Sequence, residues 1–353
     1  MLRTWRQQIT GLDIVVWAIG LAIAVMVVYG SFATLASGKY TSANWIDLTI
    51  NGLALGGVYA LIALGYTLVY GILRMINFAH SEIFMSGTFT AAFAAKGLAS
   101  LGIWDKQPIL SLLIIVIVSA AVSAIVAFLV ERIAYRPLRN APRLVPLITA
   151  IGASYFLQYA FRGLYGSGLK SYPAIHILEG TWAIGSLNVY KTQAVAIIGS
   201  LILMLILYTI VQRTKIGKAM RAVSEDKQVA ALMGIDVDRV ISFTFLLGGA
   251  AAGAGGILYI ILFPIAHFFM GFIPGIKAFT AAVLGGIGNV PGAFLGAMVL
   301  GLLEAVGPSL FLDGIGIPAP YQLKDAIAFT VLVFILIFRP SGILGERVAK
   351  TKA

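Results

Sequence analysis

The chain of 353 residues contains no cysteine, only three histidines and only 14 acidic residues. Without cysteine it can form neither a disulfide nor a thiolate metal site, and three isolated histidines offer no ligand spacing for a metal. The nucleotide-binding pattern GxxxxGK[ST] is also missing, since Gly217-Lys218 lacks both the upstream glycine and a following Ser or Thr. The sequence therefore predicts no metal, no bound cofactor and no catalytic site in this chain.

Charged residues are scarce, at 11% of the chain, whereas 60% of the residues are apolar and the mean hydropathy is +0.97. No soluble core explains this composition, so we expect a polytopic membrane protein. In lipid, a long apolar segment must satisfy its backbone groups internally, which makes the predicted fold class all-α. The apolar runs lie at residues 14–36, 46–73, 77–95, 108–130, 144–162, 193–211, 240–263, 270–288, 292–311 and 324–338. They predict about nine or ten transmembrane or re-entrant helices.

The Lys and Arg residues are distributed unevenly. If the N-terminus lies in the cytosol and the helices alternate, most of the 25 Lys and Arg residues fall on the cytosolic side, as the positive-inside rule requires. The largest groups lie in residues 131–143 and 212–239. Both termini are therefore expected in the cytosol. The net charge of +11 then reflects topology and attraction to anionic membrane lipid, and no aromatic stacking platform indicates nucleic acid.

The first apolar run, residues 14–36, follows Arg3 and Arg6 and has the outline of a signal peptide. At about 23 residues it is longer than a usual signal h-region, so we expect it to be retained as a helix. Small residues near its end, Ala36 and Ser37, leave cleavage as the alternative.

A polar interruption at residues 212–239 separates two apolar runs. A basic loop of this length favours a docking surface for a cytosolic partner, with a solvated loop that only satisfies topology as the alternative. Ser224 is expected to cap a short helix of about nine residues, and Glu225 and Asp226 suit the positive end of its dipole. Gly234 is expected to end that helix in the left-handed conformation.

The run RAVSEDKQVAALMGIDVDRVISFTFLLGGAAAGAGGILY resembles the cytosolic loop and following span of LivH-type permeases, the membrane subunits of branched-chain amino-acid ABC importers. In that family the loop is where the ATP-binding subunit docks. The small side chains of Ala230 and Ala231 would let another protein approach closely. The resemblance implies an ATPase-coupling site made of Arg221, Glu225, Ala230, Ala231, Gly234 and Ile235.

A longer stretch, INGLALGGVYALIALGYTLVYGILRMINFAHSEIFMSG at residues 50–87, resembles the opening of the same permeases almost residue for residue. Asn77, His80 and Glu82 begin the next apolar run, where a carboxylate near the bilayer centre costs about 2.5–3.5 kcal/mol on insertion scales. We expect Asn77 to cap a half-helix and these three residues to line the translocation path, with Glu82 meeting a substrate ammonium. The alternative is that they only cap a helix at the interface.

The third stretch, GIKAFTAAVLGGIGNVPGAFLGAMVLGLLEAVG at residues 275–307, also resembles this family. Its glycines around Pro291 predict a break between two short helices. Lys277 and Glu304 are the intramembrane charges here; they are candidates for the translocation path, and a structural ion pair is an equal alternative.

Three other functions fit less well. An intramembrane protease would need Ser154 to meet a base such as His267, and the sequence does not bring them together. A secondary carrier would suit the two glycine-rich regions but would not need the loop at residues 212–239. An ion channel would need a filter sequence that is missing.

The resemblance implies a permease subunit in the bacterial inner membrane that works with a second homologous permease chain, two cytosolic ATP-binding subunits and an external solute-binding protein. ATP and Mg would bind to the partner subunits. Leucine, isoleucine and valine are the expected substrates, with urea or a short amide as the alternative. The permease domain is predicted at residues 46–345, after an N-terminal extension at 1–45 and before a cytosolic tail at 346–353.

Overall fold

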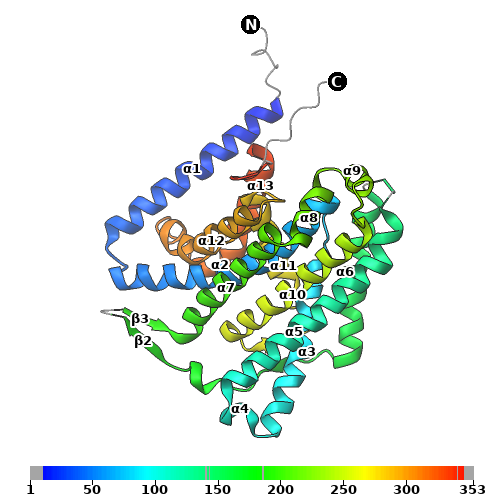
Figure 1. The fold of residues 1–353 in the computed structure, drawn as a ribbon. Coiled ribbons are helices and arrows are strands. Elements are labelled where there is room, and N and C mark those ends of the chain that lie inside the picture. The colour runs from blue at the N-terminus through cyan, green and yellow to red at the C-terminus, as the bar shows by residue number, and fades with distance from the viewer. Residues whose placement is uncertain (1–10, 140, 143, 185–186, 340, 346–353) are drawn as a thin grey trace.

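The computed structural model describes residues 11–339, except 140, 143, 185 and 186, and residues 341–345. The predicted tail at 346–353, Arg3 and Arg6 lie outside the described residues. The described chain is predominantly helical (Figure 1), so the all-α prediction is confirmed.

Each predicted apolar run contains a helix. These are α1 (Gly11–Ser37), α2 (Ser42–Leu73), α3 (His80–Ser100), α5 (Pro108–Val130), α6 (Leu144–Tyr165), α7 (Lys191–Arg213), α10 (Val237–Leu262), α11 (Phe272–Gly285), α12 (Val290–Gly307) and α13 (Lys324–Phe338). Within the described residues, eight helical segments are long and apolar enough to cross a membrane. The more polar α3 and the 14-residue α11 are not among them.

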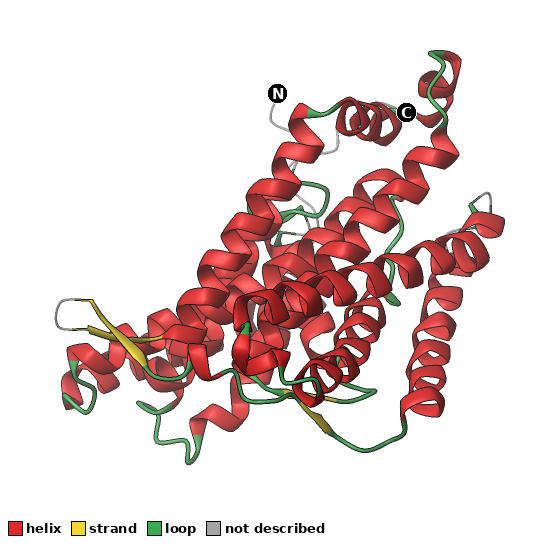
Figure 2. Ribbon diagram, turned by 60° about the horizontal axis from the view of Figure 1, so that its bottom comes forward, coloured by secondary structure: helices red, strands yellow, loops and turns green. Residues whose placement is uncertain are grey.

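Shorter elements connect the long helices. The helices are α4 (Ile103–Lys106), α8 (Lys215–Glu225) and α9 (Lys227–Leu232); the π-helices are η1 (Glu131–Tyr135) and η4 (Pro308–Leu312); and the 3₁₀ turns are η2 (Arg136–Leu138), η3 (His176–Leu178) and η5 (Pro320–Leu323). The strands are β1 (Lys170–Ser171), β2 (Thr181–Ile184), β3 (Leu187–Tyr190) and β4 (Ile265–Ala266). β1 pairs with β4 and β2 with β3, both antiparallel. Figure 2 shows that these strands lie outside the bundled helices, in the connections.

The long helices run up and down between two ends of the bundle. Figure 1 shows the start of α1 and the short helices α8 and α9 toward one end and α4 at the other. We call these ends the α9 face and the α4 face. The connections that follow α2, α5 and α7 lie at the α9 face, and those that follow α3 and α6 lie at the α4 face.

The centre of the bundle is α2, most of which is buried against α12, α10, α11 and α7. Glycine allows the close approach of α2 and α12. A Cβ atom on Gly301 would lie 2.4 Å from the carbonyl oxygen of Gly52, and one on Gly56 would lie 2.8 Å from that of Ala297. Such backbone contact is typical of tightly packed membrane helices. The glycine-rich break predicted near Pro291 is also confirmed, because α11 ends at Gly285 and Asn289 caps α12.

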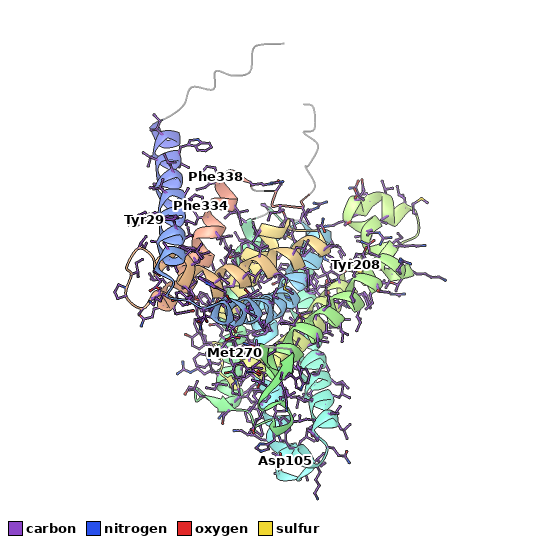
Figure 3. All side chains as sticks on the ribbon, turned by 90° about the vertical axis from the view of Figure 1, so that its left-hand side faces the viewer. Tyr29, Asp105, Tyr208, Met270, Phe334 and Phe338 are labelled. Carbon is purple, nitrogen blue, oxygen red and sulfur yellow. The ribbon has the colours of Figure 1, made fainter. Side chains whose placement is uncertain are left out.

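At the periphery, α1 packs against η4 and the end of α13. A Cβ atom on Gly30 would lie 2.1 Å from the carbonyl oxygen of Phe311, so α1 crosses η4 backbone to backbone. The rings of Trp17 and Phe338 stack edge to face with centroids 5.2 Å apart. Figure 3 shows α1, with Tyr29, standing beside this C-terminal helix. The first apolar run therefore forms one continuous helix with a defined packing partner; its retention in the mature protein stays a prediction.

Candidate functional site

The loop between α7 and α10 folds into two short helices. Thr214 caps α8 by accepting a hydrogen bond from the Gly217 amide at 3.1 Å. Asp226 caps α9 and accepts from the amides of Gln228 and Val229 at 2.8 and 3.0 Å. The backbone of Asp226 is extended, as an N-cap requires.

The prediction that Ser224 caps a nine-residue helix is wrong. Ser224 lies in the last turn of α8, where its hydroxyl donates to the carbonyl of Arg221 at 2.7 Å. The carboxylate of Asp226 accepts two amides instead, so the chain breaks there and α9 has only six residues. Glu225 consequently ends α8 rather than starting the next helix.

The predicted end of this helix is confirmed. Gly234 has φ +81°, the left-handed conformation that glycine adopts without strain. Its amide donates to the carbonyl of Ala231 at 3.0 Å, and the amide of Ile235 donates to that of Ala230 at 3.1 Å. These bonds reverse the chain sharply between α9 and α10.

The predicted coupling residues do not all face outward. Glu225, Ala231 and Gly234 are exposed, whereas Ala230 is buried and Ile235 is partly buried. Arg221 is turned inward as well and donates to the Val211 carbonyl at 2.6 Å and to Gln212 Oε1 at 2.9 Å. It therefore holds α8 against the end of α7.

The sequence did not lead us to predict the most exposed apolar side chains of this loop. Leu232 is 86% exposed and Met233 77% exposed, and Val229 is exposed beside them. The available signal was the presence of large apolar residues in an otherwise polar loop. These three side chains form an apolar patch on the α9 face.

Basic groups lie at the base of α9, before this patch. Arg74 caps α2 in the left-handed conformation and donates to the Ser224 carbonyl at 3.5 Å. Partial burial is the main cause that lowers the pKa of Lys227, and the positive charges of Arg139 and Arg74 lower it further. Lys227 is the first residue of α9, so these basic groups gather at the base of that helix.

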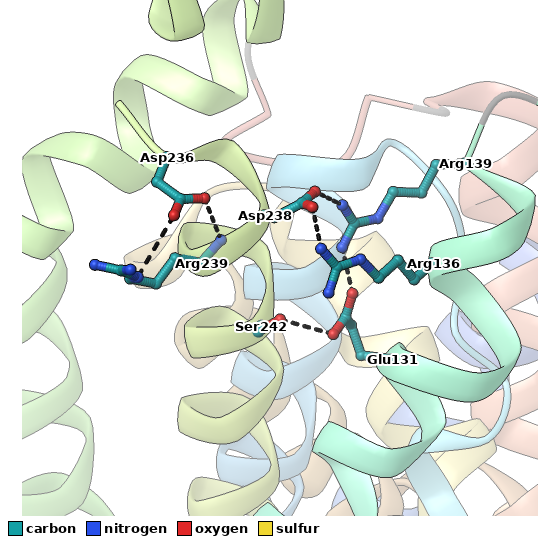
Figure 4. Close-up of polar contacts among 7 residues, drawn as sticks. All are labelled: Glu131, Arg136, Arg139, Asp236, Asp238, Arg239 and Ser242. Atoms are coloured by element: carbon teal, nitrogen blue, oxygen red, sulfur yellow. Dashed lines mark hydrogen bonds and ion pairs between the residues drawn. The ribbon is translucent and has the colours of Figure 1, made fainter. Parts of the chain in front are cut away.

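An ion network next to α9 joins the end of α5 to the start of α10 (Figure 4). Asp238 pairs with both Arg136 and Arg139, and Arg139 also pairs with Glu131. Glu131 is fully buried, and its second oxygen accepts from the Ser242 hydroxyl at 2.7 Å. From the sequence, these arginines indicated only topology.

The polar residues before α3 are buried together. Asn77, His80 and Glu82 are all less than 3% exposed. The prediction that Asn77 caps the helix is wrong, because α3 begins at His80 with Ala79 in the N-cap position and no side-chain cap. Asn77 lies two residues earlier, where its Oδ1 accepts from the Ala79 amide at 3.1 Å and from the Tyr135 hydroxyl at 3.0 Å.

Glu82 holds α6 against α3. Its Oε1 accepts from Gln158 Nε2 at 2.8 Å and lies 3.4 Å from the hydroxyls of Ser154 and Ser81. All three partners are neutral, and its Oε2 has no hydrogen-bond partner among the described residues. A buried carboxyl oxygen without a donor is free to take a proton or a cation.

Ser154 therefore meets the Glu82 carboxylate rather than His267. Among the described residues, no hydrogen bond joins Ser154 to His267, whose Nδ1 accepts from the Phe269 amide at 3.3 Å. The same part of the chain contains no group of three or more His, Asp or Glu side chains that could hold a metal ion.

Lys277 and Glu304 form a second buried cluster, toward the α4 face. Lys277 Nζ lies 2.6 Å from Glu304 Oε1 and 2.6 Å from Asp325 Oδ1. The Tyr59 hydroxyl donates to Glu304 Oε1 at 3.3 Å. The predicted path residues thus fall into two separate groups, and this one ties α11, α12 and α13 to α2.

Comparison with known proteins places these features in a family. The family profile described as "Branched-chain amino acid transport system / permease component" matches residues 48–336. The chain is 41% identical over 308 residues to the "High-affinity branched-chain amino acid transport system permease protein BraD" of Pseudomonas aeruginosa, covering 86% of this chain and 96% of that protein. It is 40% identical over 312 residues to the permease protein LivH of Escherichia coli K12, with the same coverage. No solved structure matches.

Proposed function

Because the chain belongs to the permease family of branched-chain amino acid transport systems, we propose that it carries leucine, isoleucine and valine across the inner membrane as the membrane subunit of an ATP-driven importer. The relatives' names support this substrate class, and neither supports urea. The chain itself supplies helices and a path, while ATP and Mg bind to partner subunits.

The observation that carries this proposal is the apolar patch on α9. Val229, Leu232 and Met233 expose large apolar side chains at a polar end of the bundle, where lipid tails do not cover them. Exposed apolar clusters rimmed by polar groups are typical of protein interfaces. The basic residues beside the patch add attraction for an acidic partner surface. An ATP-binding subunit docked here fits both properties.

The orientation of the chain in the membrane follows from the charges on the α9 face. The α9 face carries the arginines of η1 and η2 and the basic residues of α8 and α9, so the positive-inside rule supports a cytosolic position for it. Both termini would then be cytosolic. An external solute-binding protein would meet the α4 face, and a second permease chain would complete the membrane part.

Glu82 is our candidate for contact with the substrate in the path. It is fully buried in the bundle, has neutral partners and keeps one oxygen free. The ammonium of an amino acid is a cation that would neutralise this carboxylate. Asn77 and His80 belong to the same buried group, whereas the mutual pairing of Lys277 and Glu304 supports a structural role for those two charges.

The test is purification of the tagged chain from its native membrane in mild detergent, with identification of the co-purifying proteins. We expect two ATP-binding subunits and a second permease. Leu232→Ser should lose the ATP-binding subunits. Leu101→Ser is the matched control, because Leu101 is 71% exposed on the α4 face, and this variant should retain them.

If the unmodified chain is recovered alone and carries leucine in liposomes without ATP, it is a secondary carrier and the proposal is wrong. Equal retention of the ATP-binding subunits by the two leucine variants would instead refute the docking site on α9.

A further inference from the structure

The helix α6 is attached to the bundle more loosely than its neighbours. It packs mainly against α3 and against η1, and large side chains such as Ile148 and Phe156 project outward. Two polar contacts join it to α3: the Glu82 carboxyl, which Gln158 and Ser154 approach from the middle of α6, and the hydroxyl pair of Thr90 and Tyr165 at the end of α6. A shift of α6 therefore changes the surroundings of Glu82 directly.

By contrast, α3, α5 and α10 interlock. The Ser119 hydroxyl on α5 donates to the Gly253 carbonyl on α10 at 2.7 Å, and the Ser123 hydroxyl donates to the Ile83 carbonyl on α3 at 2.7 Å. A Cβ atom on Gly253 would lie 2.4 Å from the Ser119 carbonyl oxygen. Helices in backbone contact of this kind move together.

The segment that leads from α5 into α6 begins with η1 and η2. Its Arg136 and Arg139 both pair with Asp238, and its Glu131 accepts from Ser242. Since α5 and α10 are already interlocked along their lengths, these ion pairs are not needed to hold the two helices together. Their position instead ties the start of α10 to the chain entering α6.

Asp238 is also close to α9 along the chain. It is the second residue of α10, and only the turn at Gly234 and the cap at Asp236 separate α10 from α9. The Asp236 carboxylate accepts from the Arg239 amide at 3.0 Å, which fixes this first turn of α10. A displacement of α9 therefore reaches Asp238 before it reaches the rest of α10.

We propose that the network of Glu131, Arg136, Arg139 and Asp238 is the link through which movement of α9 reaches α6, and through α6 the Glu82 contact. This inference rests on the proposed docking of an ATP-binding subunit at α9. The π-helix η1 fits the role, because π-helical turns recur at functional sites in helices. Its Tyr135 also donates to Asn77, just before α3, so the network reaches the buried polar group by a second contact.

The test uses the complete importer and the variant Asp238→Asn, which removes the charge that both arginines share. Arg239→Met is the matched control: Arg239 is the adjacent residue, is exposed and pairs only locally with Asp236 among the described residues. Retention of the ATP-binding subunits, ATP hydrolysis and leucine uptake are measured for each protein.

We expect Asp238→Asn to retain the ATP-binding subunits as the unmodified chain does. Leucine uptake per ATP hydrolysed should fall by about tenfold or more, within the about 5- to 150-fold that coupling between sites commonly spans. Arg239→Met should keep the original ratio. If Asp238→Asn does not insert, Arg136→Met removes one of the two ion pairs and is compared with Arg132→Met, an exposed arginine of η1.

A distance measurement separates a link from a merely stabilising contact. The chain has no cysteine, so within this chain spin labels attach only to cysteines introduced at the exposed positions Tyr155 on α6 and Ile117 on α5. The proposal expects a distance change on ATP binding in the unmodified chain and in Arg239→Met, and none in Asp238→Asn.

A change that persists in Asp238→Asn, or no change in the unmodified complex, would overturn the link. Loss of the ATP-binding subunits from the unmodified chain would instead refute the proposed function on which the link rests.

Discussion

Replacing Lys277 with methionine should destabilise the protein strongly. Methionine is an apolar side chain of similar length to lysine. The substitution removes the ammonium that lies 2.6 Å from both Glu304 and Asp325. Glu304, only 2% exposed, then lies inside the bundle without its nearest cation. Among the residues that the structure describes, the other cation within 4.0 Å of Glu304 Oε1 is Lys324.

The magnitude follows from the burial of this pair. Removing one partner of a buried ion pair costs about 3–5 kcal/mol, because the other charge is left without compensation. At about 2 °C per kcal/mol for a chain of this size, the melting temperature should fall by roughly 6–10 °C. Removing the second charge as well, in Lys277→Met/Glu304→Gln, should recover most of this loss, since a buried pair replaced as a whole is often neutral.

The assay is thermal melting of the purified chain in detergent. The measured quantity is the fraction that stays monodisperse as the temperature rises. Lys324→Met is the matched control, because Lys324 is partly exposed and an exposed pair contributes about 1 kcal/mol or less. A Lys277→Met variant that melts like the unmodified chain would refute the reasoning. A double variant as unstable as the single one would refute it too. Leucine uptake by the stable double variant then reports whether these charges are needed in the path.

Three further predictions concern other parts of the bundle. Glu82→Gln keeps a group that can hydrogen-bond Gln158 but removes the negative charge. Leucine uptake should therefore fall by about tenfold, which corresponds to losing about 1.4 kcal/mol of binding free energy. Normal uptake by a properly inserted chain would exclude Glu82 from substrate contact. Gly30→Leu should force α1 away from Phe311 and cost about 1–3 kcal/mol, so a disulfide engineered across this crossing should form in the unmodified background and not in the variant. Asp226→Ala should cost about 1 kcal/mol of α9 stability and weaken retention of the ATP-binding subunits. Asp226→Asn should keep the stability of α9 and the retention of these subunits. Equal retention by the Ala and Asn variants would show that the cap has no part in docking.

The positions of the helices could be predicted because the bilayer requires long apolar runs with internally satisfied backbones. The end of α9 at Gly234 and the break before α12 could be predicted equally well, because both need backbone conformations that residues other than glycine avoid. Capping residues were not predicted correctly. Ser224 and Asp226 both have the right chemistry, and their backbone geometry decides between them: Ser224 stays helical while Asp226 is extended.

The ion clusters could not be predicted from the sequence because their partners are far apart along the chain. Arg136 and Asp238 are 102 positions apart, and Glu131 and Ser242 are 111 apart. Only the packing of α5 against α10 brings them together. Likewise, Glu82 has the spacing of a path residue, but its neutral partners on α6 appear only once that helix is placed.

The crossing of α1 and η4 has a consequence for the order in which the protein is made. Lys39 pairs with Asp313 at the end of this crossing, 274 positions later in the chain. At about 5–20 residues per second, a ribosome needs roughly 14 to 55 s to reach that partner after α1 has been synthesised. During this interval the face of α1 around Gly30 is exposed to lipid or to insertion factors. The C-terminal helices then close onto a helix that was synthesised much earlier.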